Sequence, residues 1–576
     1  MTYRHFKYEG WLYALAFTLA LGARLIALGA LPLTDAEAAP ALQALRLSQS
    51  ASSALDPHPL YILSTSLFFL MYGGGTNFLA RLIPALMGSL LVLAPLLFDN
   101  RLKPRPSLLL AFFLALDPGL AAISRQAASP ILAITFIVFT AGFVNKNKLN
   151  YAAITAALAL LSGPSVWFGI IGVGSSFAIA QAFKTQPKEI ASDEGQELKD
   201  EKPEARNEKR PLFTFQSSYF ITFLVTFIIV GTLFFTVPGG LGAAFSSIPA
   251  FLGRWFTSSD ITPGLTLLSL LIYQPFALLL AIIALIRGWA YGSRRIIFLS
   301  IWLLIAFLLV LFLPARQMAD LAWMLLPLNA LAALELARHL TVHPDERREV
   351  IGVTLLTLFI WIFAWLGFSS INWLPMDTAD FRLRAAMLVG SLLLLIISLI
   401  LIAAGWSIRI ASIGGVWGMA LSLGVLSISG LFGSAGLRGM NAPELWWQPD
   451  MPAQAQLLRE TVSQVSELGR GNDYVTTVAI MGMDSPAIEW VLRQNPVQIV
   501  STLDVNSAPD FVITANQTNP ELSSTYRGQD FIWRQSPAWT EANSSDWFRW
   551  ASLREMPQTQ ELIILWARND LFLDGR

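Results

Sequence analysis

Apolar segments of about 20 residues recur along most of this sequence and constrain its fold more than any other feature. A helix of about that length is needed to cross the hydrocarbon core of a bilayer. With 54% hydrophobic and only 14% charged residues among 576, the chain reads as a polytopic membrane protein. About thirteen spans are predicted, near residues 11–31, 82–98, 107–123, 130–145, 151–163, 166–183, 212–236, 265–286, 296–313, 319–337, 350–370, 385–404 and 410–432.

Charge and cysteine content exclude several classes of function. Lysine and arginine together equal aspartate and glutamate at 39 each, so net charge gives no argument for nucleic acid as a partner. The chain has no cysteine, which excludes disulfides, thiolate metal sites and cysteine nucleophiles.

The positions of the basic residues predict an orientation in a cell (plasma) membrane. The basic N-terminal stretch "MTYRHFKYEGW" runs into an uncleaved first span, so the N-terminus is expected in the cytoplasm. The alternation of basic loops holds only if the 14 residues 59–72 do not cross, and we expect an interfacial or re-entrant helix there. The basic residues expected inside are Arg4, Lys7, Arg101, Lys103, Arg105, Lys146, Lys148, Arg287, Arg294, Arg295, Arg338, Arg347 and Arg348.

Two domains are predicted. Residues 1–435 form the transmembrane domain, with an outer loop at 33–80 and a charged, solvated and disordered cytoplasmic connector at 184–211. Residues 436–576 alternate helix-like and strand-like stretches, which predicts a small α/β domain outside the membrane. Strands are expected at 474–482, 497–503, 510–515 and 561–568, and helices at 453–468 and 485–494. This part is rich in tryptophan, which favours core packing or interface contact over stacking on sugar rings.

The polar residues that stand out all fall on the predicted outer side. Two carboxylates, Asp35 and Glu37, lie in "TDAEA" directly after the first span. A charge within a span is costly and so indicates function, and arginine is the side chain that best holds phosphate. The basic residues on this side are Arg24, His58, Arg81, Arg125 and Arg316, the last followed by Asp320.

Each of these residues also has a structural interpretation. Thr34 and Glu37 have the spacing of a capping box. However, Pro40 lacks an N–H that a helix begun at Thr34 would use, so we expect the helix to begin near Pro40, with both carboxylates in irregular chain before it. His58 could be solvated at the membrane surface, and Arg24 could extend to lipid headgroups.

Asp117, in "LALDPGLAA", is predicted near the middle of a span. It could contact a neighbour such as an arginine or line a polar cavity. The Pro118 and Gly119 that follow indicate a local break in the helix, whose backbone groups need partners.

Together these segments resemble a known family. The order of first span, acidic outer loop, "HPLYILSTSLFFLMYGGGTNFLARLIPALMGSLL" and "LALDPGLAAISRQ" is similar to the N-terminal half of the GT-C membrane glycosyltransferases. It is closest to their protein O-mannosyltransferase and aminoarabinose-transferase branch. The similarity covers residues 10–185 well and the later spans only in architecture. It implies a GT-C-like fold and a polyprenyl-phosphate sugar as donor, used at the outer face among membrane lipids.

The resemblance also implies roles for individual residues. The family's adjacent Asp-Glu pair is split here into Asp35 and Glu37, and Ser129 stands where many members have a second aspartate. One of the two carboxylates would act as general base on an acceptor hydroxyl, with inversion at the anomeric carbon. The phosphate of the leaving lipid would be held by basic residues, namely His58, Arg81, Arg125 and Arg316, with Arg24 and Asp117 as accessory residues.

Cofactor, acceptor and activity stay open at this point. No metal is required to hold one phosphate, although an acidic pair could recruit Mg²⁺ or Mn²⁺. The acceptor could be a protein, a lipid or a glycan. The alternatives to a transferase are a flippase or flippase-associated protein in glycan export, and a protein that binds a lipid-linked sugar without reacting it.

Overall fold

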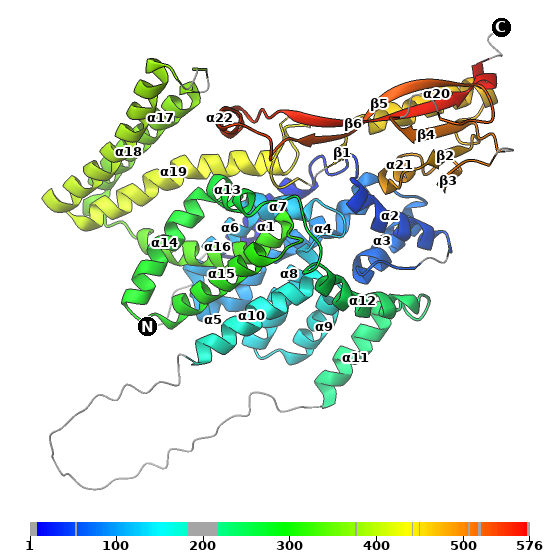
Figure 1. Ribbon diagram of the computed structural model, residues 1–576. Helices are drawn as coiled ribbons and strands as arrows, with labels where there is room; N and C mark the ends of the chain where they lie inside the picture. The colour runs from blue at the N-terminus through cyan, green and yellow to red at the C-terminus, as the bar shows by residue number, and fades with distance from the viewer. Residues whose placement is uncertain are drawn as a thin grey trace.

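A helical body and a sheet domain, which lies along one side of it, make up this computed structural model (Figure 1). The structure describes residues 9–51, 54–182, 217–371, 373–374, 377–439, 442–447, 450–504, 507–516 and 520–572. The basic residues Arg4 and Lys7 and the connector predicted at 184–211 lie outside this range. The α-helices of the body are α1 (Glu9–Leu25), α2 (Asp35–Ser48), α3 (Pro59–Tyr72), α4 (Asn77–Leu91), α5 (Asp99–Leu102), α6 (Pro104–Leu116), α7 (Pro118–Ser124), α8 (Ile131–Asn145), α9 (Leu149–Leu160), α10 (Ser165–Ala182), α11 (Ser217–Gly231), α12 (Gly239–Gly253), α13 (Pro263–Tyr273), α14 (Pro275–Ala290), α15 (Arg294–Phe312), α16 (Ala322–Leu336), α17 (Arg347–Ile371), α18 (Ala379–Gly405) and α19 (Ile408–Ser434).

The apolar segments of the sequence form helices, and the chain is a multi-pass membrane protein. Among the described residues, six helices are long and apolar enough to cross a bilayer, or up to eight if each of two bent pairs is one span. Other apolar helices have only 10–17 residues, and α3 is one of them, with the bounds expected for the interfacial helix. The predicted count of about thirteen spans is not confirmed.

Two of the predicted spans are broken in the middle, one at the position where Pro118 and Gly119 predicted a break and one where no break was expected. Helices α6 and α7 meet at Asp117 with a bend of 57°, and α13 and α14 meet at Gln274 with a bend of 94°. In both pairs a proline, Pro118 or Pro275, follows the break. Proline lacks an amide hydrogen and disfavours helical backbone in the residue before it, which explains why each helix ends there.

The two breaks are joined through the side chain of Asp117. Its Oδ2 accepts hydrogen bonds from Nε2 of Gln274 (2.8 Å) and Nδ2 of Asn329 in α16 (2.7 Å). Its Oδ1 accepts from the backbone N–H of Leu120 (2.8 Å) and so caps α7. Asp117 is 3% exposed. The expected break is present, and the aspartate supplies partners for it.

Arg24 also bridges the break between α6 and α7. Its guanidinium donates to the backbone carbonyls of Leu114 (3.1 Å) and Ala115 (3.2 Å) at the end of α6, and to Oγ of Ser124 (3.2 Å). The residue is fully buried, so the alternative in which it extends to headgroups is wrong. A cation there also suits the C-terminal end of a helix, where carbonyls lack intrahelical partners.

The sheet domain contains six strands in the order β1-β5-β6-β4-β2-β3. Strand β2 runs parallel to β3 and β4, and the other pairings are antiparallel. The α/β domain expected after the last span is therefore present. Its elements are β1 (Met451–Pro452), α20 (Ala455–Arg470), β2 (Val478–Met481), α21 (Pro486–Val491), β3 (Val497–Val500), β4 (Phe511–Ala515), β5 (Tyr526–Pro537), α22 (Ser544–Leu553) and β6 (Gln558–Arg568).

The long strand β5 and helix α22 were not among the expected elements. The first half of β5 is exposed and polar, so it lacks the alternation by which a half-buried strand is found. Its pairing with β6, which runs along most of its length, is a tertiary contact. Four tryptophans, Trp446, Trp490, Trp533 and Trp550, are at most 2% exposed, which confirms core packing for these four.

Candidate functional site

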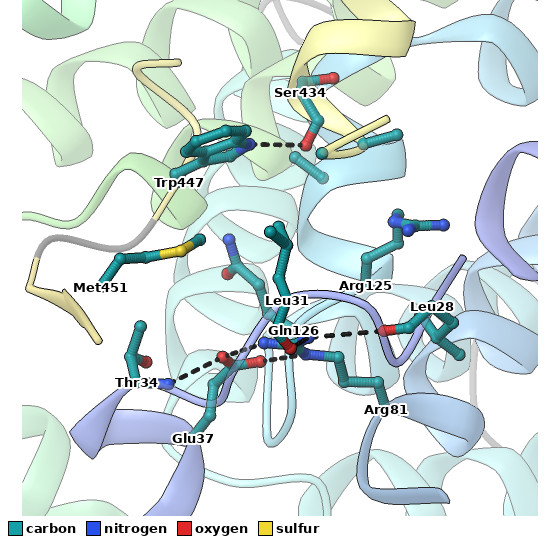
Figure 2. A pocket seen from close by; sticks show the side chains of 13 residues that line it. Leu28, Leu31, Thr34, Glu37, Arg81, Arg125, Gln126, Ser434, Trp447 and Met451 are labelled. Carbon is teal, nitrogen blue, oxygen red and sulfur yellow. Dashed lines mark hydrogen bonds and ion pairs between the residues drawn. The ribbon is translucent and has the colours of Figure 1, made fainter. Parts of the chain in front are cut away.

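A small cavity lies where the loop after α1, the start of α2, α4 and α7 meet the segment that follows α19 (Figure 2). Its volume is about 40 Å³. The lining residues are Leu28, Leu31, Thr34, Glu37, Arg81, Ala122, Arg125, Gln126, Ser434, Ala435, Gly436, Trp447 and Met451.

Glu37 is held at the cavity by the start of its own helix. Helix α2 begins at Asp35, and Thr34 and Glu37 form a capping box. The expectation that the helix starts near Pro40 is therefore wrong. The missing N–H of Pro40 forfeits one backbone bond inside the helix, whereas the capping box satisfies two amides at its start. The carboxylates consequently lie in the first helical turn, where the helix dipole favours negative charge.

Both oxygens of Glu37 have partners. Nε of Arg81 donates to Oε1 (2.8 Å) and Nη2 of Arg81 donates to Oε2 (2.6 Å), which is a two-pronged ion pair. The backbone N–H of Ala127 also donates to Oε1 (2.9 Å). The glutamate side chain is 2% exposed and that of Arg81 5%. Arg81 and Ala127 therefore occupy the positions on both oxygens from which an acceptor hydroxyl would be bound.

The two arginines of the cavity donate to backbone carbonyls at the end of α1 and in the loop that follows it. Arg125 donates to the backbone oxygens of Arg24 (3.0 Å), Ile26 (2.8 Å) and Ala27 (3.1 Å). Arg81 donates to that of Leu31 (2.7 Å) as well as to Glu37. Cations are favourable at this end of a helix. The same guanidiniums form a positively charged wall beside the cavity, and an entering phosphate would compete with their present partners.

Asp35 lies outside the cavity, although only one residue separates it from Glu37. Its Oδ2 accepts from Nη2 of Arg534 in β5 (2.6 Å), and its Oδ1 accepts from Oγ of Ser485 (2.7 Å) and the N–H of Ala487 (2.9 Å). The side chain thus connects α2 with the sheet domain. Residues i and i+2 point to different sides of a helix, which explains why Asp35 contacts the sheet domain while Glu37 lines the cavity.

The structure does not bring His58 and Arg316 to the cavity. His58 precedes α3 and packs on Gly163, where an added Cβ would lie 2.6 Å from His58 Cδ2. Removal of its ring from water lowers the pKa of His58 to about 4, so the ring is uncharged at neutral pH. Arg316 donates to the carbonyls of Ile261 (3.0 Å) and Leu311 (3.1 Å). Arg24 and Asp117 form the joint of the broken helices and do not line the cavity either.

Other lining residues were not predicted from the sequence. Gln126 follows Arg125 in "SRQAASP", and its Nε2 donates to the carbonyl of Trp446 (2.9 Å). Trp447 and Met451 come from the far end of the chain and cover the side of the cavity opposite Glu37 and Arg81 (Figure 2). We call Trp447 and Met451 the roof. A tryptophan next to a buried one gives no sequence signal of this position.

The described residues contain no group of three or more histidine, cysteine, aspartate or glutamate side chains placed to hold a metal ion. Asp35 and Glu37 do not meet, and each carboxylate pairs with a different arginine, Arg534 for Asp35 and Arg81 for Glu37.

The fold of this chain, with its broken apolar helices, an arginine-lined cavity beside the first outer loop and a sheet domain over it, is similar to that of ArnT from Cupriavidus metallidurans, as expected for a GT-C-like fold. The structure of ArnT bound to undecaprenyl phosphate aligns with 96% of this chain and 98% of its own, at a TM-score of 0.54 and 13% sequence identity. The apo structure of ArnT aligns over 88% and 93% of the two chains, at a TM-score of 0.48 and 14% identity. No family model matches the sequence, and no curated protein matches it.

Proposed function

We propose that this protein transfers a sugar from a polyprenyl phosphate to an acceptor hydroxyl at the outer face of the membrane. The observation that carries the proposal is the cavity in which the carboxylate of Glu37 meets the guanidiniums of Arg81 and Arg125. A general base and cations for a leaving phosphate are the two functions that such a reaction needs. The likeness to a fold that binds undecaprenyl phosphate in ArnT supports this donor class.

In the proposed reaction, Glu37 takes the proton from the acceptor hydroxyl while the oxygen of that hydroxyl attacks the anomeric carbon. The bond from that carbon to the phosphate oxygen breaks, and its electron pair leaves with the polyprenyl phosphate. Attack from the opposite side inverts the configuration. Arg81 and Arg125 stabilise the charge that develops on the departing phosphate. Because one phosphate carries this charge, we propose that no metal is needed for the step.

The ion pair of Glu37 gives this scheme an order. An arriving phosphate competes with Glu37 for Arg81, since guanidinium binds both anions through the same two-pronged geometry. When Arg81 turns to the phosphate, Glu37 loses two hydrogen bonds, and its oxygens become accessible to the acceptor hydroxyl. Arrival of the donor therefore frees the carboxylate for the acceptor.

The test is release of undecaprenyl phosphate from radiolabelled undecaprenyl-phosphate sugars by the full-length protein in lipid nanodiscs. Glu37→Gln is expected to reduce release by about 10²–10⁴-fold, the usual contribution of a general base. The matched control is Glu489→Gln, which also removes a carboxylate paired with an arginine, Arg46, but away from the cavity. Release that survives in Glu37→Gln at the wild-type rate would refute the role of Glu37.

A second candidate is a protein that binds the lipid-linked sugar without reacting it, including one that assists its export. It is favoured by the arginine partners of both acidic residues, which leave neither carboxylate ready as a base. The same assay separates the candidates. Saturable binding of the donor without release, in the wild type and in Glu37→Gln alike, would establish the binding protein and overturn the transferase.

A further inference from the structure

Asp35 contacts three residues of the sheet domain, two at the start of helix α21 and one in strand β5. Its Oδ1 accepts from the backbone N–H of Ala487, the second residue of α21, and so caps that helix from another part of the chain. The same oxygen accepts from Oγ of Ser485. Its Oδ2 forms the ion pair with Arg534 of β5.

Arg534 connects this contact to the roof of the cavity. In the sheet, Arg534 pairs with Pro452 of the two-residue strand β1, and Gln535 pairs with Met451. Met451 lines the cavity. At the other end of the connection, Asp35 lies between Thr34 and Glu37, which line the cavity from the opposite side. The ion pair of Asp35 with Arg534 therefore connects the helix that carries Glu37 with the strand that pairs with Met451.

The surrounding interface has further contacts through α21. Nε1 of Trp490 donates to Oδ1 of Asn77 (2.8 Å), and Nε of Arg493 donates to the carbonyl of Gly75 (3.0 Å). Arg46 of α2 pairs with Glu489. These contacts attach α21 to the region around α2 and α4. They do not include β5, whose side-chain bond to the helical body at this place is the one from Arg534.

The segment before the roof is fixed separately. Glu444 is 2% exposed, accepts a hydrogen bond from the hydroxyl of Tyr273 and pairs with Arg554 of the sheet domain (3.4 Å). The N–H of Leu445 donates to the same hydroxyl (3.1 Å). With this end fixed, Met451 is placed by its pairing with β5, and Arg534 of β5 is bound to α2 through Asp35.

We propose that Asp35 is a positioning residue that holds the sheet domain, and with it Met451, closed over the cavity. The placement stands on the contacts above, and its consequence for sugar transfer rests on the proposed function. Met451 lines the side of the cavity that lies opposite Glu37 and Arg81 (Figure 2). Release of the Asp35 to Arg534 pair lets β5 and β1 move away from α2 and opens the cavity from the roof side, while Glu37, Arg81 and Arg125 remain in place.

The absence of cysteine from the sequence allows a direct test. Cysteines introduced for the exposed residues Gln49, next to α2, and Gln464, in α20, carry spin labels for a pulsed distance measurement in nanodiscs. Asp35→Asn removes the charge but keeps one oxygen for Ser485 and Ala487, so it isolates the ion pair. We expect one narrow distance in the wild type, and a broader or longer distribution in Asp35→Asn and in Arg534→Gln.

Two matched variants make the result specific. Glu561→Gln removes the other carboxylate that pairs with Arg534 (3.1 Å) and is expected to keep the narrow distance. The double variant Asp35→Asn/Arg534→Gln removes both charges and allows a neutral hydrogen bond between the two side chains, so it should recover part of the narrow population. A wild-type distribution in Asp35→Asn, or an equal change in Glu561→Gln, would overturn the proposal.

A kinetic measurement relates the positioning to the reaction. If the roof excludes water from the donor, Asp35→Asn raises hydrolysis of the donor relative to transfer and leaves binding of undecaprenyl phosphate unchanged. A global loss of structure would instead reduce binding and transfer together, and would count against positioning. If the wild type neither binds nor uses the donor, the proposed function fails, while the distance measurement still decides the role of Asp35.

Discussion

Glu37 and Arg81 form a buried two-pronged ion pair, with Nε–Oε1 at 2.8 Å and Nη2–Oε2 at 2.6 Å. Truncation of Arg81 to alanine leaves the glutamate charge buried without its partner, which costs about 3–5 kcal/mol of stability. The pair of Arg46 with Glu489 is the control, because the Arg46 side chain is 44% exposed and such pairs contribute about 0–1 kcal/mol. Thermal unfolding in detergent should show a much lower melting temperature for Arg81→Ala than for Arg46→Ala, and equal melting temperatures would contradict the buried pair.

The joint between the two broken spans gives a second prediction. Asp117→Ala removes the acceptor for Gln274, Asn329 and the N–H of Leu120, at about 1–3 kcal/mol for each donor left without a partner. The variant is expected to unfold at lower temperature than the wild type. The exposed Asp530 of β5 is the control, and Asp530→Ala should be near neutral. A mild effect of Asp117→Ala would mean that the two breaks do not depend on this side chain.

Gly119 in α7 allows close contact with the segment that leads to the roof. A Cβ at this position would lie 2.5 Å from Cζ2 of the buried Trp446. Gly119→Ala is therefore expected to destabilise the protein by about 1–3 kcal/mol, the usual cost of overpacking. Gly174 in α10 has nothing within 4 Å of its Cβ position, and Gly174→Ala should be neutral or stabilising by up to about 1 kcal/mol. Opposite signs in a thermal-shift comparison would bear out the close contact.

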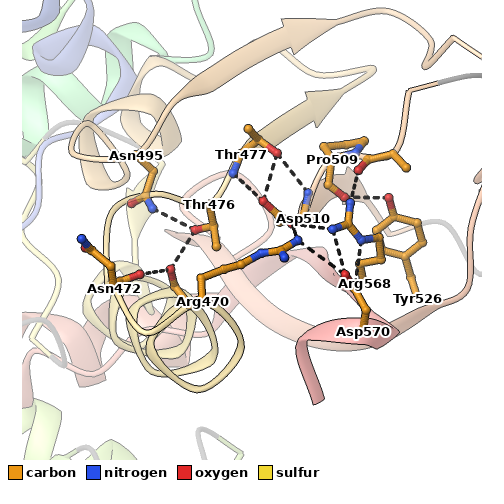
Figure 3. A network of polar contacts seen from close by, with 12 residues as sticks. Arg470, Asn472, Thr476, Thr477, Asn495, Pro509, Asp510, Tyr526, Arg568 and Asp570 are labelled. Atoms are coloured by element: carbon orange, nitrogen blue, oxygen red, sulfur yellow. Dashed lines mark hydrogen bonds and ion pairs between the residues drawn. The ribbon is translucent and has the colours of Figure 1, made fainter. Parts of the chain in front are cut away.

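The polar contacts of Asp510, the residue directly before β4, predict that the stability of the protein depends on pH (Figure 3). Burial alone would raise the pKa of Asp510, but hydrogen bonds from Arg470 and Thr477 and the charge of Arg568 lower it overall. A carboxyl with a lowered pKa in the folded state adds stability above its ordinary pKa of 3.8, and this is lost as the pH falls through the lowered value.

The variant Asp510→Asn tests this sign. It should lose about 1–3 kcal/mol at pH 7, where the carboxylate accepts from both arginines, and less at pH 3, which lies below the ordinary pKa of 3.8. Unfolding of the protein by urea at the two pH values measures the difference, with Asp530→Asn as the exposed control. A loss that is the same at both pH values would mean that the charge of Asp510 contributes nothing.

Asp35 and Glu37 are two positions apart in the sequence but have different partners in the structure. Their spacing indicated that they need not face the same way, and the structure sends one to the sheet domain and one to the cavity. Helix α2 begins at Asp35 and not near Pro40, because the loss of one backbone bond at Pro40 is smaller than the gain from two amides satisfied by the capping box. Nothing in the sequence near position 534 indicates a partner for Asp35, since the two residues are 499 positions apart.

Apolar length and periodicity are local properties, so they were enough to predict a helical membrane protein with an α/β domain after its last span. The motif order also pointed to the GT-C fold. Which charges meet follows from the folded chain: Arg81 and Arg125 lie at the cavity, Arg24 and Asp117 at a joint of broken helices, and His58 and Arg316 elsewhere. The physical reason is that a buried charge takes whatever partner the folded chain brings within hydrogen-bond distance, and that partner can come from any position in the sequence.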